Sequence, residues 1–486
     1  DPNCVPFNFF GLLASPEALD YVIEQNQTLS ELEHVVINAN VGGSPFEIFG
    51  NDVGINVGYE HRRESGSFNP SEFEQQGRGR GASITPIEGS FNVDEVFGEL
   101  FVPLVTPEND FLVESITAYA RGRYVDNTVN GGFFSWAAGG SIAPVPDIEF
   151  RGNFTRSFRA PAITELFLPE SPAFTFVPDL CFAAAIDGGP NPTARRRNCD
   201  AFLAAFPNLS RPQLAAQRSI PSVSGGNPNL ENEQADSYSL GVILRPWFAP
   251  GLSITTDYVN ISISDPIANL TAAQINSGCF DNDDFDVTDP ANGNSFCSII
   301  RRDATGEPIA DAANPGVRTG FTNGNAIDFE GIQSELQYST SLEGVGIPGD
   351  LALRGSLQVV LRRVIDITGV APARTDADIG DPTWTGQLAA QYRLDNFGFG
   401  TVLNYTGEQL FSRFNRNPDA RQFDQLRGFV TADFNVFFET DDDFRFNFVV
   451  NNAFGRECQR LNDFCIPGGI NDAFGRQFSA SVTKAF

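Results

Sequence analysis

The segment Ile148-Glu-Phe-Arg-Gly-Asn-Phe-Thr-Arg-Ser-Phe-Arg159 decides how the chain is interpreted. Its apolar residues Ile148, Phe150, Phe154 and Phe158 alternate with Glu149, Arg151, Asn153, Thr155, Ser157 and Arg159. A period of two places these sets on opposite faces of a β-strand, one apolar and one polar. The same alternation recurs at 351–362, 383–392 and 444–451, whereas helical periodicity is scarce. The sequence therefore predicts an all-β protein.

Composition narrows the class of protein. The 486 residues carry 61 acidic and 32 basic side chains, a net charge of -29, which argues against a nucleic-acid partner because phosphates need a basic surface. With 41% hydrophobic residues and 45 Phe, the chain is not a disordered acidic tail. No stretch approaches the length of apolar sequence that a membrane-spanning helix needs, but a spanning β-strand needs only about 10 alternating residues.

The connections distinguish a membrane barrel from a soluble sandwich. We expect about 15 strands, near 31–43, 46–64, 89–104, 110–126, 132–144, 147–158, 232–248, 252–266, 325–343, 350–366, 381–395, 397–412, 427–440, 443–457 and 475–486. Short turns, the first at Gly42–Pro45, alternate with long connections such as 159–231 and 267–324. Long on one side and short on the other is typical of a transmembrane antiparallel β-barrel with long extracellular loops.

The cysteines form local couples. Of the seven, Cys181 and Cys199, Cys279 and Cys297, and Cys458 and Cys465 each flank a short loop, while Cys4 is left over. No pair has the spacing of a zinc ribbon or a thioredoxin-type redox site, so we expect no metal centre. Disulfides that staple long loops are typical of an oxidising compartment. All of these cysteines would lie on the side of the long connections.

Several segments resemble the TonB-dependent outer-membrane receptors. The most specific match is Arg151-Gly-Asn-Phe-Thr-Arg-Ser-Phe-Arg-Ala-Pro161 with Glu165-Leu-Phe167. Further matches are Cys4–Gly11 followed by Ser15–Tyr21, Val57–Ser65, Gly89–Val96, Asn227-Pro-Asn-Leu-Glu-Asn-Glu233, Asp257–Asn260, Val450–Phe454 and the terminal Phe486. The resemblance runs along essentially the full chain in the family's order.

The resemblance implies a multi-pass barrel in the outer membrane of a Gram-negative bacterium, in contact with membrane lipid and lipopolysaccharide. The family's barrel has 22 strands and is closed by an N-terminal plug. Residues 1–486 would then be the C-terminal part of the barrel domain, with the plug, the TonB box and the first strands outside this sequence. The family imports ferric siderophores, cobalamin or oligosaccharides with energy from the TonB–ExbB–ExbD complex. It implies no enzymatic activity and no bound cofactor.

Two other functions remain open from the residues. A passive porin would have a polar lumen without energy coupling, and a barrel without its plug could serve a structural or partner-binding role in a surface assembly. Between siderophore and oligosaccharide, the loops show no ligand signature.

We expect ligand capture by the loops 159–231 and 267–324, which are too long for simple connectors. Short helical patches are predicted within the first loop, at Thr193–Phe206 and Arg211–Arg218. Arg195-Arg-Arg197 is equally consistent with an anion-binding or a structural role. The acidic run 281–289 lacks EF-hand spacing, so a solvated loop is favoured over a calcium site. Trp136, Trp247 and Trp384 are expected at the membrane interface or in the barrel wall.

Overall fold

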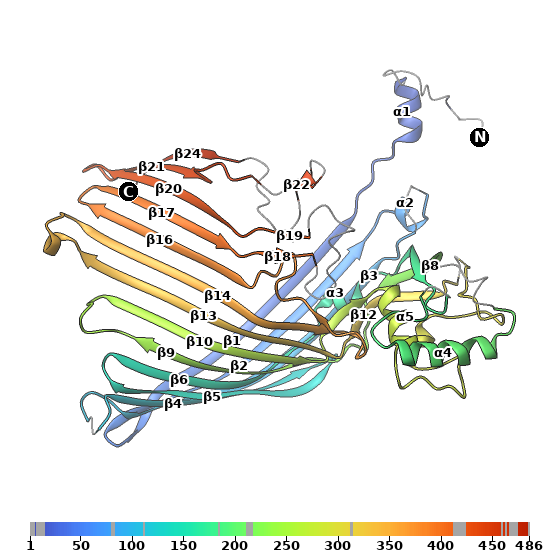
Figure 1. Cartoon of the computed structure of the whole chain (residues 1–486), viewed down its shortest axis with the longest axis horizontal. Helices are drawn as coiled ribbons and strands as arrows, with labels where there is room; N and C mark the ends of the chain where they lie inside the picture. Colours follow the sequence, from blue (N-terminus) through green and yellow to red (C-terminus); the bar gives the residue numbers. More distant parts are fainter. Residues whose placement is uncertain are drawn as a thin grey trace.

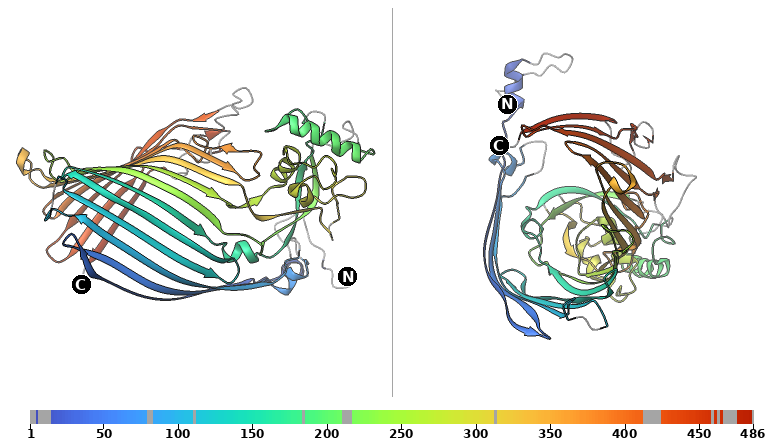
Figure 2. Two further views of the ribbon diagram at one scale, coloured as in Figure 1. Left: turned by 90° about the horizontal axis from the view of Figure 1, so that it is seen from below. Right: turned by 90° about the vertical axis from the view of Figure 1, so that its left-hand side faces the viewer.

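The computed structural model describes residues 5, 15–78, 83–109, 112–182, 185–209, 217–311, 314–411, 424–457, 460–461, 464–465 and 475–484. Its main body is one antiparallel sheet whose strands follow one another in chain order and curve into the wall of an incomplete cylinder (Figures 1 and 2). The path runs through β1 (Leu29–Ile48), β2 (Asn51–Asn69), β3 (Ile87–Val105), β4 (Ser115–Asn127), β5 (Gly131–Val145), β6 (Ile148–Arg159), β9 (Glu233–Leu244), β10 (Leu252–Ser264), β13 (Ala326–Ser341), β14 (Asp350–Asp366), β16 (Trp384–Leu394), β17 (Phe397–Thr406), β20 (Phe429–Glu439), β21 (Phe444–Asn451) and β24 (Gln477–Lys484).

This sheet confirms the predicted fold class. Every strand on the path overlaps one of the predicted strands, and the two-residue β15 (Ala373–Arg374) adds a short pairing beside β14. The path begins at β1 and ends at β24, which are therefore the edge strands of the described sheet.

The predicted sidedness of the connections is present. Tight turns lie at one end of the sheet, on the left in Figure 1, and the long connections lie at the other, together with the short β4–β5 connection of residues 128–130. The first predicted turn, Gly42–Pro45, is wrong. The chain there stays in β1 as a bulge between Gly43 and Phe46, and it turns instead at Phe49 (φ 54°) and Gly50 (φ 81°). Two consecutive positive φ angles are typical of a tight hairpin turn.

The register divides the sheet into two chemically different faces. Side chains of opposite residues share a face, and exposed apolar residues pair in this way along the wall, as in Leu388 opposite Leu403 and Tyr124 opposite Phe134. We call this the apolar face. The other, the polar face, carries pairs such as Gln387 and Asn404, whose side chains are hydrogen-bonded at 2.8 Å.

Aromatic residues mark the two ends of the apolar face. Trp384 and Tyr392 lie near opposite ends of β16. These two residues are eight positions apart, which corresponds to about 27 Å along the strand. If the strand is tilted by about 40°, their separation along the membrane normal is about 20 Å. Trp136 packs against Phe154 at the long-connection end, with ring centroids 5.2 Å apart. Trp247 lies in the β9–β10 turn and is 78% exposed. These positions are consistent with aromatic girdles at the two membrane surfaces.

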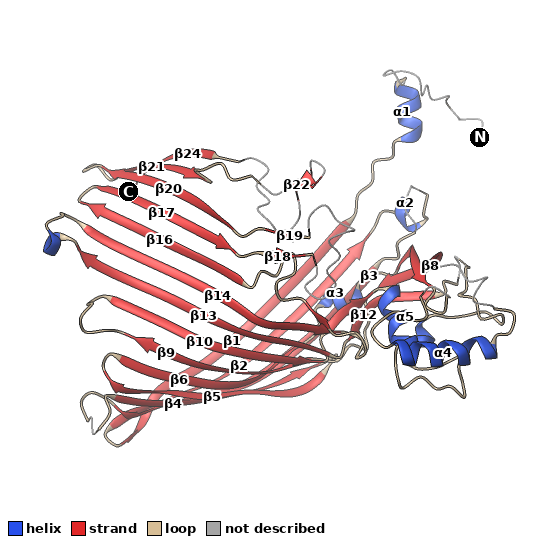
Figure 3. Ribbon diagram, viewed as in Figure 1, coloured by secondary structure: helices blue, strands red, loops and turns tan. Residues whose placement is uncertain are grey.

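The α-helices lie at the end of the long connections (Figure 3). Outside the two longest connections, the described residues also form α1 (Pro16–Val22), α2 (Glu72–Gln75), the 3-10 helix η2 (Glu343–Val345) and the short pairs β18 (Gln409–Leu410) with β19 (Gln425–Leu426) and β22 (Arg460–Leu461) with β23 (Phe464–Cys465). No helix within the described ranges has both the length and the apolarity to cross a membrane.

Candidate functional site

The two longest connections fold together into one outer domain (Figures 1 and 3). The connection after β6 contributes α3 (Ile163–Phe167), β7 (Ser171–Pro178), α4 (Pro192–Ala205) and β8 (Gln217–Gly225), and the one after β10 contributes β11 (Ile267–Leu270), α5 (Ala272–Phe280), α6 (Ser295–Ile299) and β12 (Val317–Asn323). A four-stranded sheet in the order β11-β12-β8-β7 joins them, with β12 parallel to β8. The loops expected to capture ligand are thus a single structural unit.

The helical patches predicted in this region have different outcomes. Thr193–Phe206 is confirmed as α4. For Arg211–Arg218, residues 211–216 lie outside the described residues, and Gln217 and Arg218 begin β8, so the helical prediction is wrong there.

Two disulfides occupy the core of the outer domain. Cys181 is bonded to Cys199 and Cys279 to Cys297, as their spacing suggested. All four are buried in one cluster, where Phe202 of α4 meets Phe280 of α5 edge-on at 5.4 Å. The disulfides therefore staple two separate connections around a shared core. The side chains of Cys458, Cys465 and Cys4 lie outside the described part of the chain.

A buried ion pair links the same two connections. Arg195 on α4 donates from Nε and Nη2 to the two carboxylate oxygens of Asp281 at 2.5 and 2.6 Å, and Asp281 is fully buried. Ser277 donates to the same carboxylate at 2.5 Å. Arg195 is thereby committed to structure, while Arg196 pairs with Asp187 and Arg197 donates to the carbonyl oxygen of Asp283 at 3.0 Å. The possible anion-binding role of the three arginines receives no support from these contacts.

The acidic run 281–289 is only partly a solvated loop. Asp281 is buried in the core of the outer domain, contrary to the prediction of a solvated loop. Asp286 accepts hydrogen bonds from the amide and hydroxyl of Thr288, and these bonds lower the pKa of its carboxyl. Asp289 accepts from the Asn292 amide at 2.8 Å. Within the described ranges, no three His, Cys, Asp or Glu side chains are grouped so as to hold a metal ion.

Arg302 lies against two aromatic rings in the core of the outer domain. Its guanidinium lies 4.8 Å from the ring centroid of Phe202 and 5.9 Å from that of Phe280, and it donates to the carbonyl oxygen of Gly306 at 3.1 Å. Burial lowers the pKa of Arg302 to about 10, so it remains charged at neutral pH.

Arg159, at the end of the most specific sequence motif, fastens the outer domain to the wall. It donates to both carboxylate oxygens of Glu233 at 2.6 and 2.8 Å and to Glu165 on α3 at 2.9 and 3.2 Å. Glu233 also accepts the amide of Ile267, the first residue of β11, at 2.6 Å. The guanidinium therefore connects β6 with β9 and α3, Glu233 extends the connection to β11, and the motif holds the outer domain in place.

The polar face of the wall carries ion pairs along its length. Arg151 bonds Asp257 at 2.5 and 2.8 Å across the intervening strand β9, directly over Gly241. A Cβ at Gly241 would lie 2.0 Å from a carboxylate oxygen of Asp257, so glycine leaves room for the pair. Elsewhere on this face, Arg123 reaches the buried Glu95 at 2.5 Å. Such a wall suits a water-filled or protein-filled passage.

Comparison with known proteins identifies the family. The model of the family "TonB dependent receptor-like, beta-barrel" matches residues 9–453. The siderophore receptor PirA from Acinetobacter baumannii has a similar fold at 14% identity, with a TM-score of 0.60 over 94% of this chain and 55% of that one. A ferric enterobactin receptor (PfeA) mutant from Pseudomonas aeruginosa, in complex with enterobactin, gives the same values. Among curated proteins, nothing matches.

The chain belongs to the family of TonB-dependent receptor β-barrels, whose members are transport receptors of the outer membrane and not enzymes. It spans about 55% of the length of the two receptors just named. The position of the strands and the sidedness of the loops could be predicted from the sequence. The joining of the two connections could not, because β12, Val317–Asn323, has no regular alternation of apolar and polar residues.

Proposed function

We propose that this chain forms the larger part of the wall of a receptor that captures a scarce, bulky ligand outside the cell and imports it with energy supplied by TonB. One observation carries the proposal: a membrane-type wall is joined, at one end only, to an outer domain held by two disulfides and a buried ion pair. A rigid domain beside the mouth of a passage is suited to first capture of a ligand.

A ferric siderophore is the ligand class we favour. The two similar receptors are a siderophore receptor and a ferric enterobactin receptor, and this chain shares their fold. Cobalamin and oligosaccharides are the other ligand classes that the experiment below separates.

We further propose that additional strands join β24 to β1 in the complete receptor, to give the family's 22, and that a plug fills the passage. Unpaired backbone groups of an edge strand are costly in lipid, since no water is there to bond them. An incomplete wall with β1 and β24 as its edges would not persist in a bilayer.

Uptake measurements test the import. Cells carrying the complete gene are given radioactive iron as a panel of ferric siderophores, with and without a functional TonB–ExbB–ExbD complex. We expect uptake of at least one chelate that is lost when the complex is disabled. Uptake that is independent of the complex would indicate a passive porin. No uptake, but growth on a glycan or on cobalamin, would replace the siderophore with that ligand. A barrel with a structural role predicts none of these effects.

A further inference from the structure

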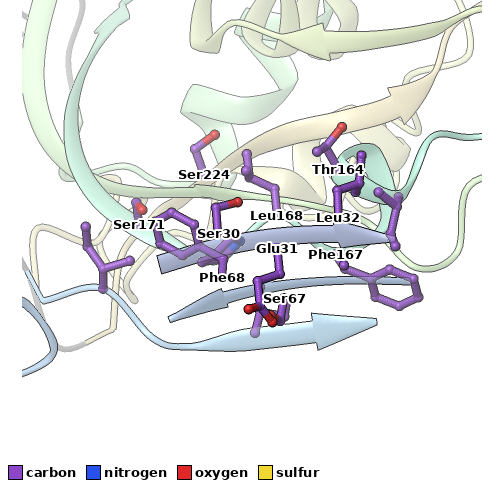
Figure 4. Close-up of a pocket in the computed structure, with 15 residues that line it drawn as sticks. Ser30, Glu31, Leu32, Ser67, Phe68, Thr164, Phe167, Leu168, Ser171 and Ser224 are labelled. Atoms are coloured by element: carbon purple, nitrogen blue, oxygen red, sulfur yellow. The ribbon is translucent and has the colours of Figure 1, made fainter. Parts of the chain in front are cut away.

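A cavity of about 310 Å³ lies where the wall meets the outer domain (Figure 4). Ser30 and Leu32 of β1 and Phe68 of β2 form one side of it. The opposite side consists of α3 with the following Leu168, and the paired residues Ser171 of β7 and Ser224 of β8. The cavity is thus bounded by both parts of the molecule.

Along β1 and β2, the polar face changes its character near the outer domain. Ser30 is opposite Phe68 and Leu32 is opposite Gly66, so these residues share a face. Further along the same face toward the tight turns, polar pairs follow, such as His34 opposite Glu64 and Asn38 opposite Glu60. The polar character therefore gives way to an apolar patch at the height of the outer domain.

The helix α3 beside the cavity is packed closely against the wall. The wall has glycines where α3 approaches it: a Cβ at Gly89 would lie 2.4 Å from Phe167, and one at Gly66 would lie 3.2 Å from Ile163. Ile163 and Leu166 are buried in a cluster with residues of β3 and β4. The hollow beside this helix is open on one side, so its apolar lining is accessible to a ligand, and burial of an apolar group against it is favourable.

The chemistry of the lining specifies the occupant. It is mainly aliphatic, with contributions from Ile84 and Ile87, and hydroxyl groups are its main polar side chains. Glu31 is its one charged residue, and its side chain points to the opposite side of β1 from Ser30 (Figure 4). A cavity of about 310 Å³ is near the lower limit for a small-molecule site, so it fits one arm of a bulky ligand.

We propose that this cavity binds an uncharged apolar arm of the imported ligand, such as a medium-length acyl chain. The inference rests on the proposed import and narrows its ligand to an amphiphile. The polar part of the ligand would remain on the side of the passage, where the wall is charged.

Binding of a fluorescent acyl probe, 11-dansylaminoundecanoic acid, tests this assignment. The complete receptor is placed in lipid nanodiscs, and empty nanodiscs are subtracted. Ser30→Phe fills the cavity, whereas Ser65→Phe makes the same change on the apolar face of the neighbouring strand β2. We expect saturable binding that is at least tenfold weaker in Ser30→Phe and unchanged in Ser65→Phe, with both variants showing wild-type resistance of the barrel to denaturing detergent.

Equal binding by the two variants, or a signal that never saturates, would overturn the assignment. So would binding that is present in this chain alone and absent from the complete receptor, because another part of the receptor would then fill the cavity. Iron uptake is measured separately on the same variants. Saturable, Ser30-dependent probe binding without any energy-dependent uptake would refute the import and leave the acyl site standing.

Discussion

At the scale of single residues, the outer domain is most exposed to damage at the buried pair of Arg195 and Asp281, where either substitution would strand a charge. Both side chains are nearly inaccessible to solvent, so removing one leaves the other charge buried without a partner. We predict that Asp281→Ala lowers the unfolding free energy of the outer domain by about 3–5 kcal/mol. Proteolysis within the outer domain, followed at increasing urea concentrations, gives the unfolding free energy of this domain.

The matched control is Asp283→Ala, two residues further along. Asp283 is 74% exposed and lies 3.6 Å from Arg197, so its loss should change the unfolding free energy by less than about 0.5 kcal/mol. If the two variants behaved alike, the pair would not be buried in solution.

Arg159 gives a second prediction at this scale. Arg159→Ala removes two hydrogen bonds to Glu165 that hold α3 to the wall and two to Glu233 of the neighbouring wall strand. Its side chain is 46% exposed, so screening limits the expected loss to about 1 kcal/mol. Proteolytic cleavage near α3 should accelerate. Arg245→Ala, which breaks the exposed pair with Glu149 at the opposite end of the wall, should leave that cleavage rate unchanged; equal acceleration would contradict the fastening role.

At the scale of elements, the disulfides should stabilise the outer domain and not the wall. Replacing Cys181 and Cys199 together by Ala opens a loop whose ends are 18 residues apart, which predicts a loss of about 3 kcal/mol. The wall is held by its own ladder of hydrogen bonds. Protease resistance of the outer domain should fall, while the migration of the unheated barrel in gel electrophoresis stays that of the wild type. A wall that unfolds together with the outer domain would refute this independence.

The elements also show what the sequence can predict. Strands such as β6 and β14 follow from alternation, because a wall between lipid and a polar interior demands one face of each kind. The first turn was misplaced because Gly42-Gly-Ser-Pro45 is compatible with either a turn or a bulge, and the register beyond it decides. Contacts within the outer domain were beyond prediction, since Arg195 and Asp281 are 86 residues apart in sequence and only the fold brings them together.

At the scale of the whole molecule, function depends on which face of the wall meets lipid. Leu388 and Gln387 are neighbours on β16, and the register places them on the apolar and polar faces respectively. Their environments should therefore differ sharply although they are adjacent in the chain. A substitution at the polar position would lose the hydrogen bond of Gln387 to Asn404.

Paired arginine substitutions test this orientation. Leu388→Arg would place a charge against hydrocarbon near the middle of the strand, and we predict a loss of about 2–4 kcal/mol in the free energy of folding into bilayers. Gln387→Arg points the same charge into the polar interior, where water or carboxylates solvate it, so its cost should stay below about 1 kcal/mol. Urea titration of folding into phospholipid vesicles measures both. A larger loss for Gln387→Arg than for Leu388→Arg would mean that the two faces are assigned the wrong way round.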